Sequence, residues 1–408
     1  MLARVTITAH SRHVKIALVT ETFPPEINGV AMTFGTLARE LGRRRHAVTV
    51  FRPNRPDLAN RLADPDFVEV ALPGLPIPGY PLLRLGLPAG GTLRRRWRAD
   101  RPDVVHVATE GPLGMSAISA ARTLRIPVTS SFHTNFHAYT RHYGVAPLHR
   151  LALAWLRRVH NRTRRTFAPT ADLCTELAGL GFANLAVLSR GVDTGQFRPA
   201  RRSNALREAW GVTESDTVLL HAGRLAPEKN YPLLFRAHAA ARAANSRCRS
   251  IIVGDGPLRP RLQREHPEAL FTGFLPREEL ARHYASADVY VHASTTETYG
   301  NVLTEAMASG LAAVGFDYAA ARLFLRSGEN GLAVPLGDPE ALVRAAARLA
   351  ADRLFQRRLG AAAALAMEAQ SWEIVLQHFE SDLAKVVEEA RVSEPPPPSS
   401  VYPAALVP

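Results

Sequence analysis

Cysteine is nearly absent from this sequence. Cys174 and Cys248 are the only two in 408 residues and stand far apart, which excludes a disulfide framework and the paired cysteines of a metal or redox motif. No apolar run reaches about 18 residues, so no helix long enough to cross a membrane is predicted. The stretch 1–13 also lacks the apolar core of a secretory signal. We therefore expect a cytoplasmic protein, either free or peripherally bound to the inner face of the membrane.

Lysine is also rare. Only Lys15, Lys229 and Lys385 occur among 50 basic residues, so arginine carries nearly all the positive charge. The formal net charge of +13 predicts an anionic partner: nucleic acid, an anionic membrane surface or a phosphorylated substrate. Because lysine is so rare, Lys229 in a polar loop is a candidate functional residue.

The chain is long enough for two core-forming domains of about 150–200 residues each. Short apolar runs, many of them β-branched, alternate with helical stretches in both halves, which predicts an α/β fold with buried parallel strands. These runs are Val14–Thr20, Val48–Phe51, Phe67–Leu72, Val104–Val107 and Val128–Phe132, then Val218–Ala222, Ile251–Val253, Phe271–Leu275 and Val289–Val291. The polar stretch Thr194–Ser203 between the halves is interpreted as a hinge.

The stretch from Glu297 to Gly310 organises the second half. Gly300 and Asn301 are predicted to be a turn and an N-cap for a helix that carries Glu305 and stops at Gly310. Both carboxylates would then face the C-terminal edge of a parallel sheet, where open α/β folds bind ligands. A carboxylate there can accept two vicinal sugar hydroxyls. The alternative is a solvated acid pair beside a capped helix.

Other candidates also follow predicted strands. Arg224 and Lys229 sit five apart in a strand-to-helix loop, so both can reach a diphosphate over that helix N-terminus; the alternative is a solvated charged loop. Gly29 lies in the first strand-to-helix loop and is a phosphate-binding glycine or a plain turn residue. His133 ends the strand that begins at Val128 and points at the same crevice, although a lone histidine is more often structural.

Several of these motifs resemble one family. The segment from Glu297 follows E-x-Y-G-N-x-x-x-E-A-x-A-S-G, the pattern around the E-x7-E signature of family 4 retaining glycosyltransferases. The S-F-H-T around His133, the G-R-x-x-x-x-K of Arg224 and Lys229, and the R-G-V-D-x-x-x-F from Arg190 extend the resemblance to nearly the whole chain.

The resemblance implies the GT-B architecture: two Rossmann-like domains that face each other across a donor-binding cleft, with a C-terminal helix crossing back to the first domain. The expected division is an acceptor-side domain at 1–198, a nucleotide-sugar domain at 199–372, a returning helix at 373–391 and a flexible Pro-rich tail at 392–408.

It also implies roles for the candidate residues. Glu305 would bind the nucleotide ribose, Glu297 the donor sugar's hydroxyls, and His133 would lie beside the anomeric centre. Gly29 would abut the donor phosphates, and the backbone at Leu275 would hold the base. Gly300 and Asn301 would belong to the same donor-binding loop.

No metal cluster is evident in the sequence. Arg224 and Lys229, with the helix N-termini, would therefore stabilise the leaving diphosphate, and no metal or other cofactor is expected beside the nucleotide-sugar.

The pattern is nearest to GDP-mannose-dependent α-mannosyltransferases that act on a lipid or glycan acceptor. A UDP-sugar donor, UDP-glucose in particular, is the alternative. A basic, non-catalytic nucleic-acid-binding or scaffolding protein is a remote alternative, and no nucleic-acid motif supports it. A pyridoxal-phosphate phosphorylase would need Lys229 as a Schiff base.

The remaining features concern the surface. Pro147–Arg165 is predicted to be a basic amphipathic helix that either lies on an anionic membrane or packs on the sheet. Leu72–Pro88 is expected to be an ordered surface loop, and Leu93–Arg98 a basic, aromatic patch. Asp64–Asp66 imitates a D-x-D metal motif but is interpreted as a loop.

Overall fold

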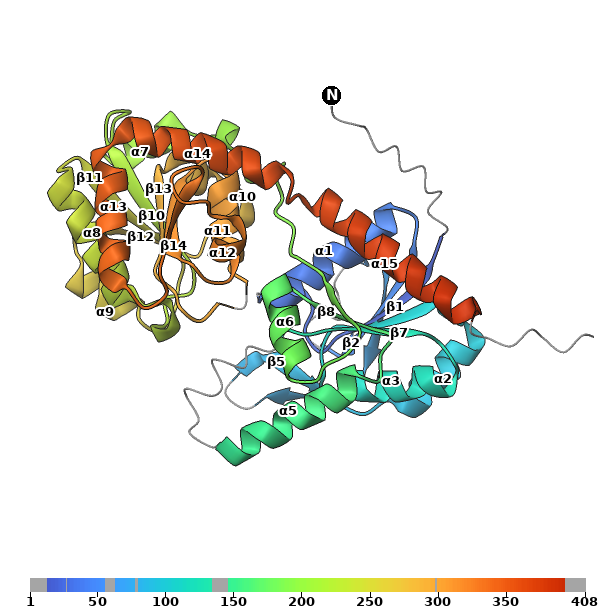
Figure 1. Ribbon diagram of the computed structural model, residues 1–408. Helices are drawn as coiled ribbons and strands as arrows, with labels where there is room; N and C mark the ends of the chain where they lie inside the picture. Colours follow the sequence, from blue (N-terminus) through green and yellow to red (C-terminus); the bar gives the residue numbers. More distant parts are fainter. Residues whose placement is uncertain are drawn as a thin grey trace, which may run out of the picture.

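In the computed structural model, the chain forms two α/β domains that lie side by side (Figure 1). The structure describes residues 13–26, 28–55, 63–77, 80–133, 146–297 and 299–392, with only the backbone at 80–83 and 146–150. The predicted tail after position 392 lies outside these residues.

The first domain is built on a seven-stranded sheet in which all neighbouring strands are parallel. The strand order is β3-β2-β1-β6-β7-β8-β9. The strands are β1 (Lys15–Val19), β2 (Ala47–Pro53), β3 (Val68–Leu72), β6 (Val104–Val107), β7 (Val128–Ser131), β8 (Arg165–Ala168) and β9 (Leu185–Val187). Strands buried on both faces are apolar almost without interruption, which is why the bounds of β6 match the prediction.

Helices cover this sheet, and one of them comes from the far end of the chain. They are α1 (Gly29–Arg43), α2 (Gly90–Ala99), α3 (Pro112–Thr123), α5 (Ala146–His160), α6 (Ala171–Gly179) and α15 (Trp372–Val392). Phe379 and Leu383 of α15 pack in one core cluster with Ile16 and Phe34. The predicted C-terminal helix that returns to the first domain is thereby confirmed (Figure 1).

Two surface predictions for the first domain were wrong. Leu72–Pro88 contains a hairpin of β4 (Gly74–Ile77) and β5 (Tyr80–Gly86), which pair antiparallel despite their proline and glycine content. Leu93–Arg98 lies in α2, where Leu93 and Trp97 are buried against the domain core. The helix therefore exposes arginines but no aromatic side chain there, because its apolar residues recur at helical spacing and face inward.

The second domain has a six-stranded parallel sheet with the order β12-β11-β10-β13-β14-β15. Its strands are β10 (Thr217–Ala222), β11 (Cys248–Val253), β12 (Leu270–Gly273), β13 (Val289–His292), β14 (Ala312–Phe316) and β15 (Gly331–Val334). Its helices are α7 (Asn204–Ala209), α8 (Tyr231–Ala244), α9 (Arg259–Glu265), α10 (Arg277–Ser286), α11 (Asn301–Ala308), α12 (Ala320–Phe324), α13 (Pro339–Ala351) and α14 (Arg353–Glu368). This strand order is that of doubly wound nucleotide-binding sheets, so the predicted pair of parallel α/β domains is confirmed.

The chain crosses between the domains earlier than the sequence indicated. Leu188 belongs to the core of the first domain, whereas Val192 and Phe197 belong to the core of the second. On the way back, Ser371 pairs with Val192 in a parallel bridge, so the two crossings lie side by side. The predicted hinge Thr194–Ser203 follows the crossing and packs on the second domain through Phe197.

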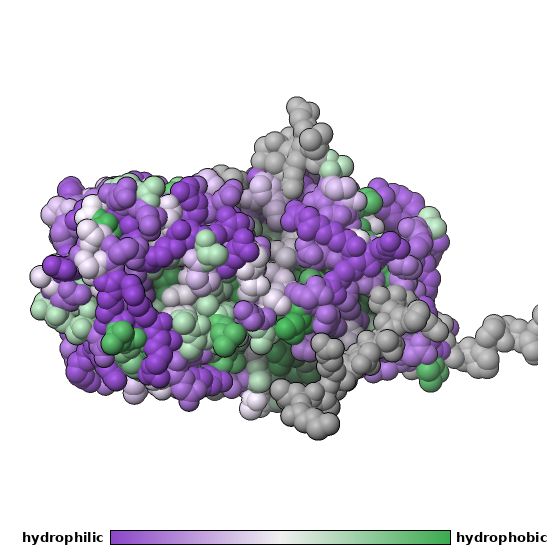
Figure 2. Space-filling model, turned by 90° about the horizontal axis from the view of Figure 1, so that it is seen from above, coloured by the Kyte–Doolittle hydropathy of each residue, from purple (hydrophilic) through white to green (hydrophobic). Residues whose placement is uncertain are grey.

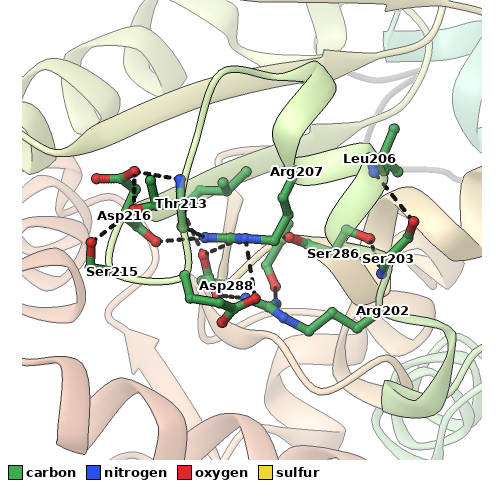
Figure 3. A network of polar contacts seen from close by, with 12 residues as sticks. Arg202, Ser203, Leu206, Arg207, Thr213, Ser215, Asp216, Ser286 and Asp288 are labelled. Carbon is green, nitrogen blue, oxygen red and sulfur yellow. Dashed lines mark hydrogen bonds and ion pairs between the residues drawn. The ribbon is translucent and has the colours of Figure 1, made fainter.

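A buried arginine, Arg207, links the first helix of the second domain to its surroundings by hydrogen bonds. Arg207 of α7 is 2% exposed and donates to the carboxylate of Asp288 at 3.0 Å. Its terminal nitrogens also donate to the carbonyls of Ser286, Thr213 and Asp216 at 2.7–2.8 Å (Figure 3). The carboxylate and the carbonyls together offset the hydration that the guanidinium loses on burial.

Helix α5 ends at His160, before the predicted end at Arg165. The backbone N–H and the hydroxyl of Thr163 both donate to the carbonyl of His160, at 2.9 and 2.7 Å, and close a turn. Arg165 then begins β8 and forms an ion pair with Asp382 of α15 at 3.0 Å.

The predicted apolar face of α5 is only partly buried. Leu156 and Val159 pack inside, whereas Leu151 is 67% and Trp155 is 41% exposed. Hydrophilic residues dominate the face of the molecule seen in Figure 2, and smaller apolar patches gather near the middle. Across the residues with described structure, no helix has the length and apolar character that a bilayer span requires.

Candidate active site at the domain junction

Each sheet reverses its strand order at one point, between β1 and β6 in the first domain and between β10 and β13 in the second. Ligands of open α/β sheets bind outside the carboxyl ends of the strands at such a point. The candidate residues follow these strands or their neighbours: Gly29 follows β1, His133 follows β7, Arg224 and Lys229 follow β10, and Glu297 follows β13.

Lys229 and Glu297 meet directly. Lys229 Nζ donates to Glu297 Oε1 at 2.5 Å, and the two side chains are 18% and 15% exposed. Burial by itself would raise the pKa of Glu297, but the charge of Lys229 holds it below the usual value. Glu297 is therefore ionised at neutral pH, and the contact brings together two predicted residues 68 positions apart.

His292 is a neighbour that the sequence reasoning missed. It is the last residue of β13, and its Nε2 lies 4.0 Å from Glu297 Oε1. Burial holds the pKa of His292 below its usual value, so the ring is neutral at pH 7. The only signal in the sequence is its place at the end of an apolar strand, immediately before the polar run that leads to Glu297.

The turn before α11 differs from the prediction. Gly300 itself is the N-cap, with φ of +99° in the left-handed region, and Asn301 is the first helical residue. The prediction of Asn301 as N-cap was therefore wrong, because the glycine adopts a backbone conformation that other residues rarely reach. Asn301 Oδ1 is buried and has no hydrogen-bond partner in the described part of the chain.

Glu305 lies about one turn into α11, as predicted. Burial raises its pKa to about 7, although the charge of Arg277 and a hydrogen bond with Tyr284 act in the opposite direction. The carboxyl is therefore partly protonated near neutral pH. The groups that lower its pKa, Arg277 and Tyr284, both belong to α10.

Arg224 stands apart from that contact. Its side chain is 65% exposed, and the guanidinium pairs with the carboxylate of Glu228, four residues along the same loop. The loop after β10 packs tightly on the loop after β11, so that there is no room for a side chain at Gly254. A Cβ on Gly254, whose φ is +131°, would lie 1.9 Å from the carbonyl oxygen of Gly223. Leu275 follows β12 and packs partly buried on the domain core. The loops after three adjacent strands thus form one edge of the second domain.

The first domain contributes Gly29 and His133. Gly29 opens α1, and a Cβ there would lie 2.7 Å from Nη1 of Arg190. The ring of His133 packs edge-on against Phe34 at 5.4 Å, and neither ring nitrogen has a hydrogen-bond partner within the described residues. Burial, together with the charge of Arg190, holds the pKa of His133 well below its usual value, so the imidazole is neutral.

Metal ligands are not assembled in the part of the chain that the structure describes, where no three His, Cys, Asp or Glu side chains come together. The two aspartates of the D-x-D-like loop instead pair with arginines of α1: Asp64 with Arg39 at 3.1 Å and Asp66 with Arg43 at 3.2 Å.

A cavity of about 430 Å³ lies away from these residues, between α8 and α9. Its lining arginines are engaged in ion pairs with glutamates, Arg242 with Glu268 and Arg261 with Glu265. The convergent polar groups of a binding site therefore lie at the domain junction and not in this cavity.

The two halves of the chain match family models for sugar-transferring enzymes. Residues 27–196 match Glycosyltransferase Family 4, and residues 216–352 match Glycosyl transferases group 1. A GDP-mannose-dependent alpha-mannosyltransferase of Mycobacterium tuberculosis is 35% identical over 90% of this chain and 97% of that protein. Its namesake in Corynebacterium glutamicum is 32% identical over 91% and 90%.

Solved structures share the fold at lower identity. HepE of Anabaena in complex with UDP superimposes with a TM-score of 0.73 at 20% identity, covering 91% of this chain and all of that one. Sucrose-phosphate synthase of Thermosynechococcus elongatus gives 0.72 at 18% identity, covering 92% and 99%. The chain belongs to the family 4 glycosyltransferases, the glycosyl transferases group 1, and is an enzyme that transfers a sugar from a nucleotide-sugar donor.

Proposed function

We propose that this enzyme transfers mannose from GDP-mannose to a hydroxyl of a lipid or glycan acceptor, with retention of anomeric configuration and without a metal ion. Three relatives that are 32–35% identical over at least 90% of this chain are all GDP-mannose-dependent alpha-mannosyltransferases, which supports the choice of donor. The observation that carries the chemistry is the contact between Lys229 and Glu297 at the switch point of the second sheet.

In this proposal the ammonium and carboxylate act on adjacent parts of the donor. An ammonium has three N–H donors, so Lys229 can bind a phosphate oxygen and still hold Glu297. The ionised Glu297 accepts hydrogen bonds from the mannose hydroxyls, and Glu305 accepts them from the ribose. Arg224, on its exposed loop, supplies a further charge to the diphosphate, which lowers the energy of the departing anion.

Retention follows from attack on the face that the diphosphate leaves. The acceptor oxygen bonds to the anomeric carbon as the bond to the β-phosphate oxygen breaks, and the acceptor proton passes to that phosphate oxygen. In this scheme the Glu297 carboxylate stays bound to Lys229 and forms no bond to the anomeric carbon. A 2-fluoro donor that trapped a glycosyl-Glu297 adduct with a competent rate of turnover would overturn this step.

UDP-glucose is the competing donor. A relative at 27% identity, the alpha-monoglucosyldiacylglycerol synthase of Streptococcus pneumoniae, favours this second candidate. A thermal-shift panel of GDP, UDP, GDP-mannose and UDP-glucose, each with EDTA, separates the two. A ligand at about 100 times its Kd stabilises the fold by about 2.7 kcal/mol. Stabilisation by the guanosine pair alone supports the proposal, and stabilisation by the uridine pair alone refutes the donor.

The exposed part of α5 supports a peripheral membrane role for a lipid-modifying enzyme. Leu151 and Trp155 are exposed beside Arg157 and Arg158, which are also exposed. Apolar and aromatic groups flanked by arginine suit an anionic bilayer surface.

Sedimentation with vesicles tests this role. The double change Leu151→Glu and Trp155→Glu is expected to abolish binding to phosphatidylglycerol vesicles, whereas Leu354→Glu, at a leucine of α14 that is 83% exposed, is the control. Equal binding of both variants and the wild type would contradict the role of α5.

A further inference from the structure

Arg190 lies where the chain crosses from the first domain to the second, and its backbone is fixed there. Its carbonyl accepts hydrogen bonds from the hydroxyl of Tyr299 at 2.7 Å and from Gln370 Nε2 at 3.3 Å. The guanidinium carbon lies 5.5 Å from the centre of the Tyr299 ring, a cation–π distance. The side chain is 7% exposed, so the junction encloses a positive charge.

That charge has no counterion in the described part of the chain. No carboxylate there lies within ion-pairing distance of Arg190, and its buried Nε has no hydrogen-bond partner. The buried Nε of Arg207 also lacks a hydrogen-bond partner among these residues, but its terminal nitrogens donate to Asp288 and to three carbonyls. A buried guanidinium without such partners is costly unless an anion binds it.

The guanidinium is aimed at a place suited to an anion. Its Nη1 would lie 2.7 Å from a Cβ on Gly29, the first residue of the 15-residue helix α1. Asn28 Oδ1 accepts from the N–H groups of Val30 and Ala31, which leaves the N–H of Gly29 uncapped by that side chain. A helix N-terminus and a guanidinium together favour a phosphate group.

Arg190 is also within electrostatic range of both sides of the candidate site. Its charge acts on His133, and the charge of Glu297 acts on Arg190. Arg190 is therefore electrostatically coupled both to the group expected beside the anomeric centre and to the group expected to hold the sugar. The part of a nucleotide-sugar that lies closest to the sugar is the β-phosphate.

We propose that Arg190 binds the β-phosphate of the nucleotide-sugar donor from the Gly29 side, facing Lys229, and stabilises the charge that develops there as the sugar leaves. Its planar guanidinium can donate two parallel hydrogen bonds to phosphate oxygens, which a lysine cannot reproduce. The inference rests on the proposed function in one respect, namely that the donor binds between Gly29 and Glu297.

The test compares nucleotides that differ by one phosphate. Calorimetric affinities for GDP and GMP, or for UDP and UMP if the wild type prefers uridine, are measured on wild type, Arg190→Gln and Arg190→Lys. Loss of a charged hydrogen bond is expected to weaken diphosphate binding about tenfold or more in Arg190→Gln, with monophosphate binding nearly unchanged. Arg190→Lys is expected to recover part of the difference, and kcat with the intact donor to fall about a hundredfold in Arg190→Gln.

Tyr299→Phe is the matched control for a structural role. It removes the hydroxyl that holds the Arg190 carbonyl but leaves the guanidinium, so the ratio of diphosphate to monophosphate affinity is expected to stay that of the wild type. Without ligand, Arg190→Gln is expected to melt no earlier than the wild type, because an unpaired buried charge has been removed.

The outcomes are distinguishable. Equal weakening of both nucleotides in Arg190→Gln, or unchanged affinity with a lower melting temperature, would overturn the inference and make Arg190 a junction residue only. Failure of the wild type to bind any nucleoside diphosphate would overturn the proposed function itself.

Discussion

The two domains have the same kind of sheet but treat their polar groups differently. At the second switch point Lys229 and Glu297 compensate one another at 2.5 Å. At the first, the ring of His133 and Nε of Arg190 are buried without hydrogen-bond partners among the described residues. Buried polar groups are normally hydrogen-bonded. Unpartnered buried atoms also occur in the second domain, at His292 Nδ1 and Asn301 Oδ1. The domains therefore differ in charge compensation: the second holds a preformed ion pair, whereas Arg190 is a buried cation whose burial an anionic ligand would offset.

The largest effect is expected from breaking the preformed contact. In the proposed mechanism Lys229→Ala removes a donor to the developing phosphate charge, and it leaves Glu297 without its cation. We expect kcat to fall about a hundredfold to a thousandfold while the far-UV circular dichroism is retained, measured with radiolabelled GDP-mannose.

Lys385→Ala is the matched lysine control for that experiment. Lys385 lies on α15 with a 61% exposed side chain, and it contacts Asp382 at 3.7 Å. This variant is expected to keep full activity. An active Lys229→Ala enzyme would remove Lys229 from the mechanism.

Glu297→Gln keeps the shape of the side chain but removes its charge. We expect kcat to fall about a hundredfold, since a neutral amide holds the donor hydroxyls less well.

Because the folded pKa of Glu297 is lowered, its stabilising contribution is present above its usual pKa and lost as the pH falls through the folded value. Urea unfolding should therefore show the gap in stability between wild type and Glu297→Gln closing below about pH 4.5; a gap that persists there would contradict the ion pair.

Glu305 is expected to behave in the opposite sense. Its folded pKa is raised to about 7, so the folded state holds an extra proton between about pH 4.5 and 7. The free energy of unfolding should therefore fall as the pH rises across that range, by at most about 3 kcal/mol. Glu305→Gln should remove this pH dependence. If the carboxylate binds the ribose, GDP affinity should rise as the pH rises through 7. A pH-independent affinity in the wild type would argue against that role.

The smallest effect is expected at an exposed contact between the domains. Arg322 of α12 lies 3.6 Å from Asp172 of α6, and the two side chains are 50% and 60% exposed. Such surface pairs contribute about 0–1 kcal/mol. Arg322→Ala should therefore change kcat/KM and the melting temperature little; a large loss of activity would show that this surface pair, and not only the buried junction, matters for catalysis.

The sequence predicted those features that depend on local pattern. Strands such as β6 are buried on both faces and almost wholly apolar, so they can be identified without knowledge of their neighbours. Glu305 falls one turn into α11 because Gly300 and Gly310 delimit that helix. The parallel strand ends also placed Lys229 and Glu297 on one edge, although only the structure brings them into contact.

Features that depend on tertiary contacts or on backbone conformation could not be predicted. The end of α5 is set by Thr163. Its hydrogen bonds to the carbonyl of His160 close a turn in place of a further turn of helix. The helix start at Asn301 follows from the left-handed backbone of Gly300. In the sequence, Arg190 stands out only as part of the R-G-V-D motif. Its contact with Gly29 joins the two ends of the first domain's sequence, which no local pattern reveals.

The most direct test of the central claim is a crystal structure of the enzyme with bound GDP. The account predicts that the ribose lies at Glu305 and that the β-phosphate lies within hydrogen-bond distance of both Lys229 and Arg190. A β-phosphate out of reach of both side chains would contradict it.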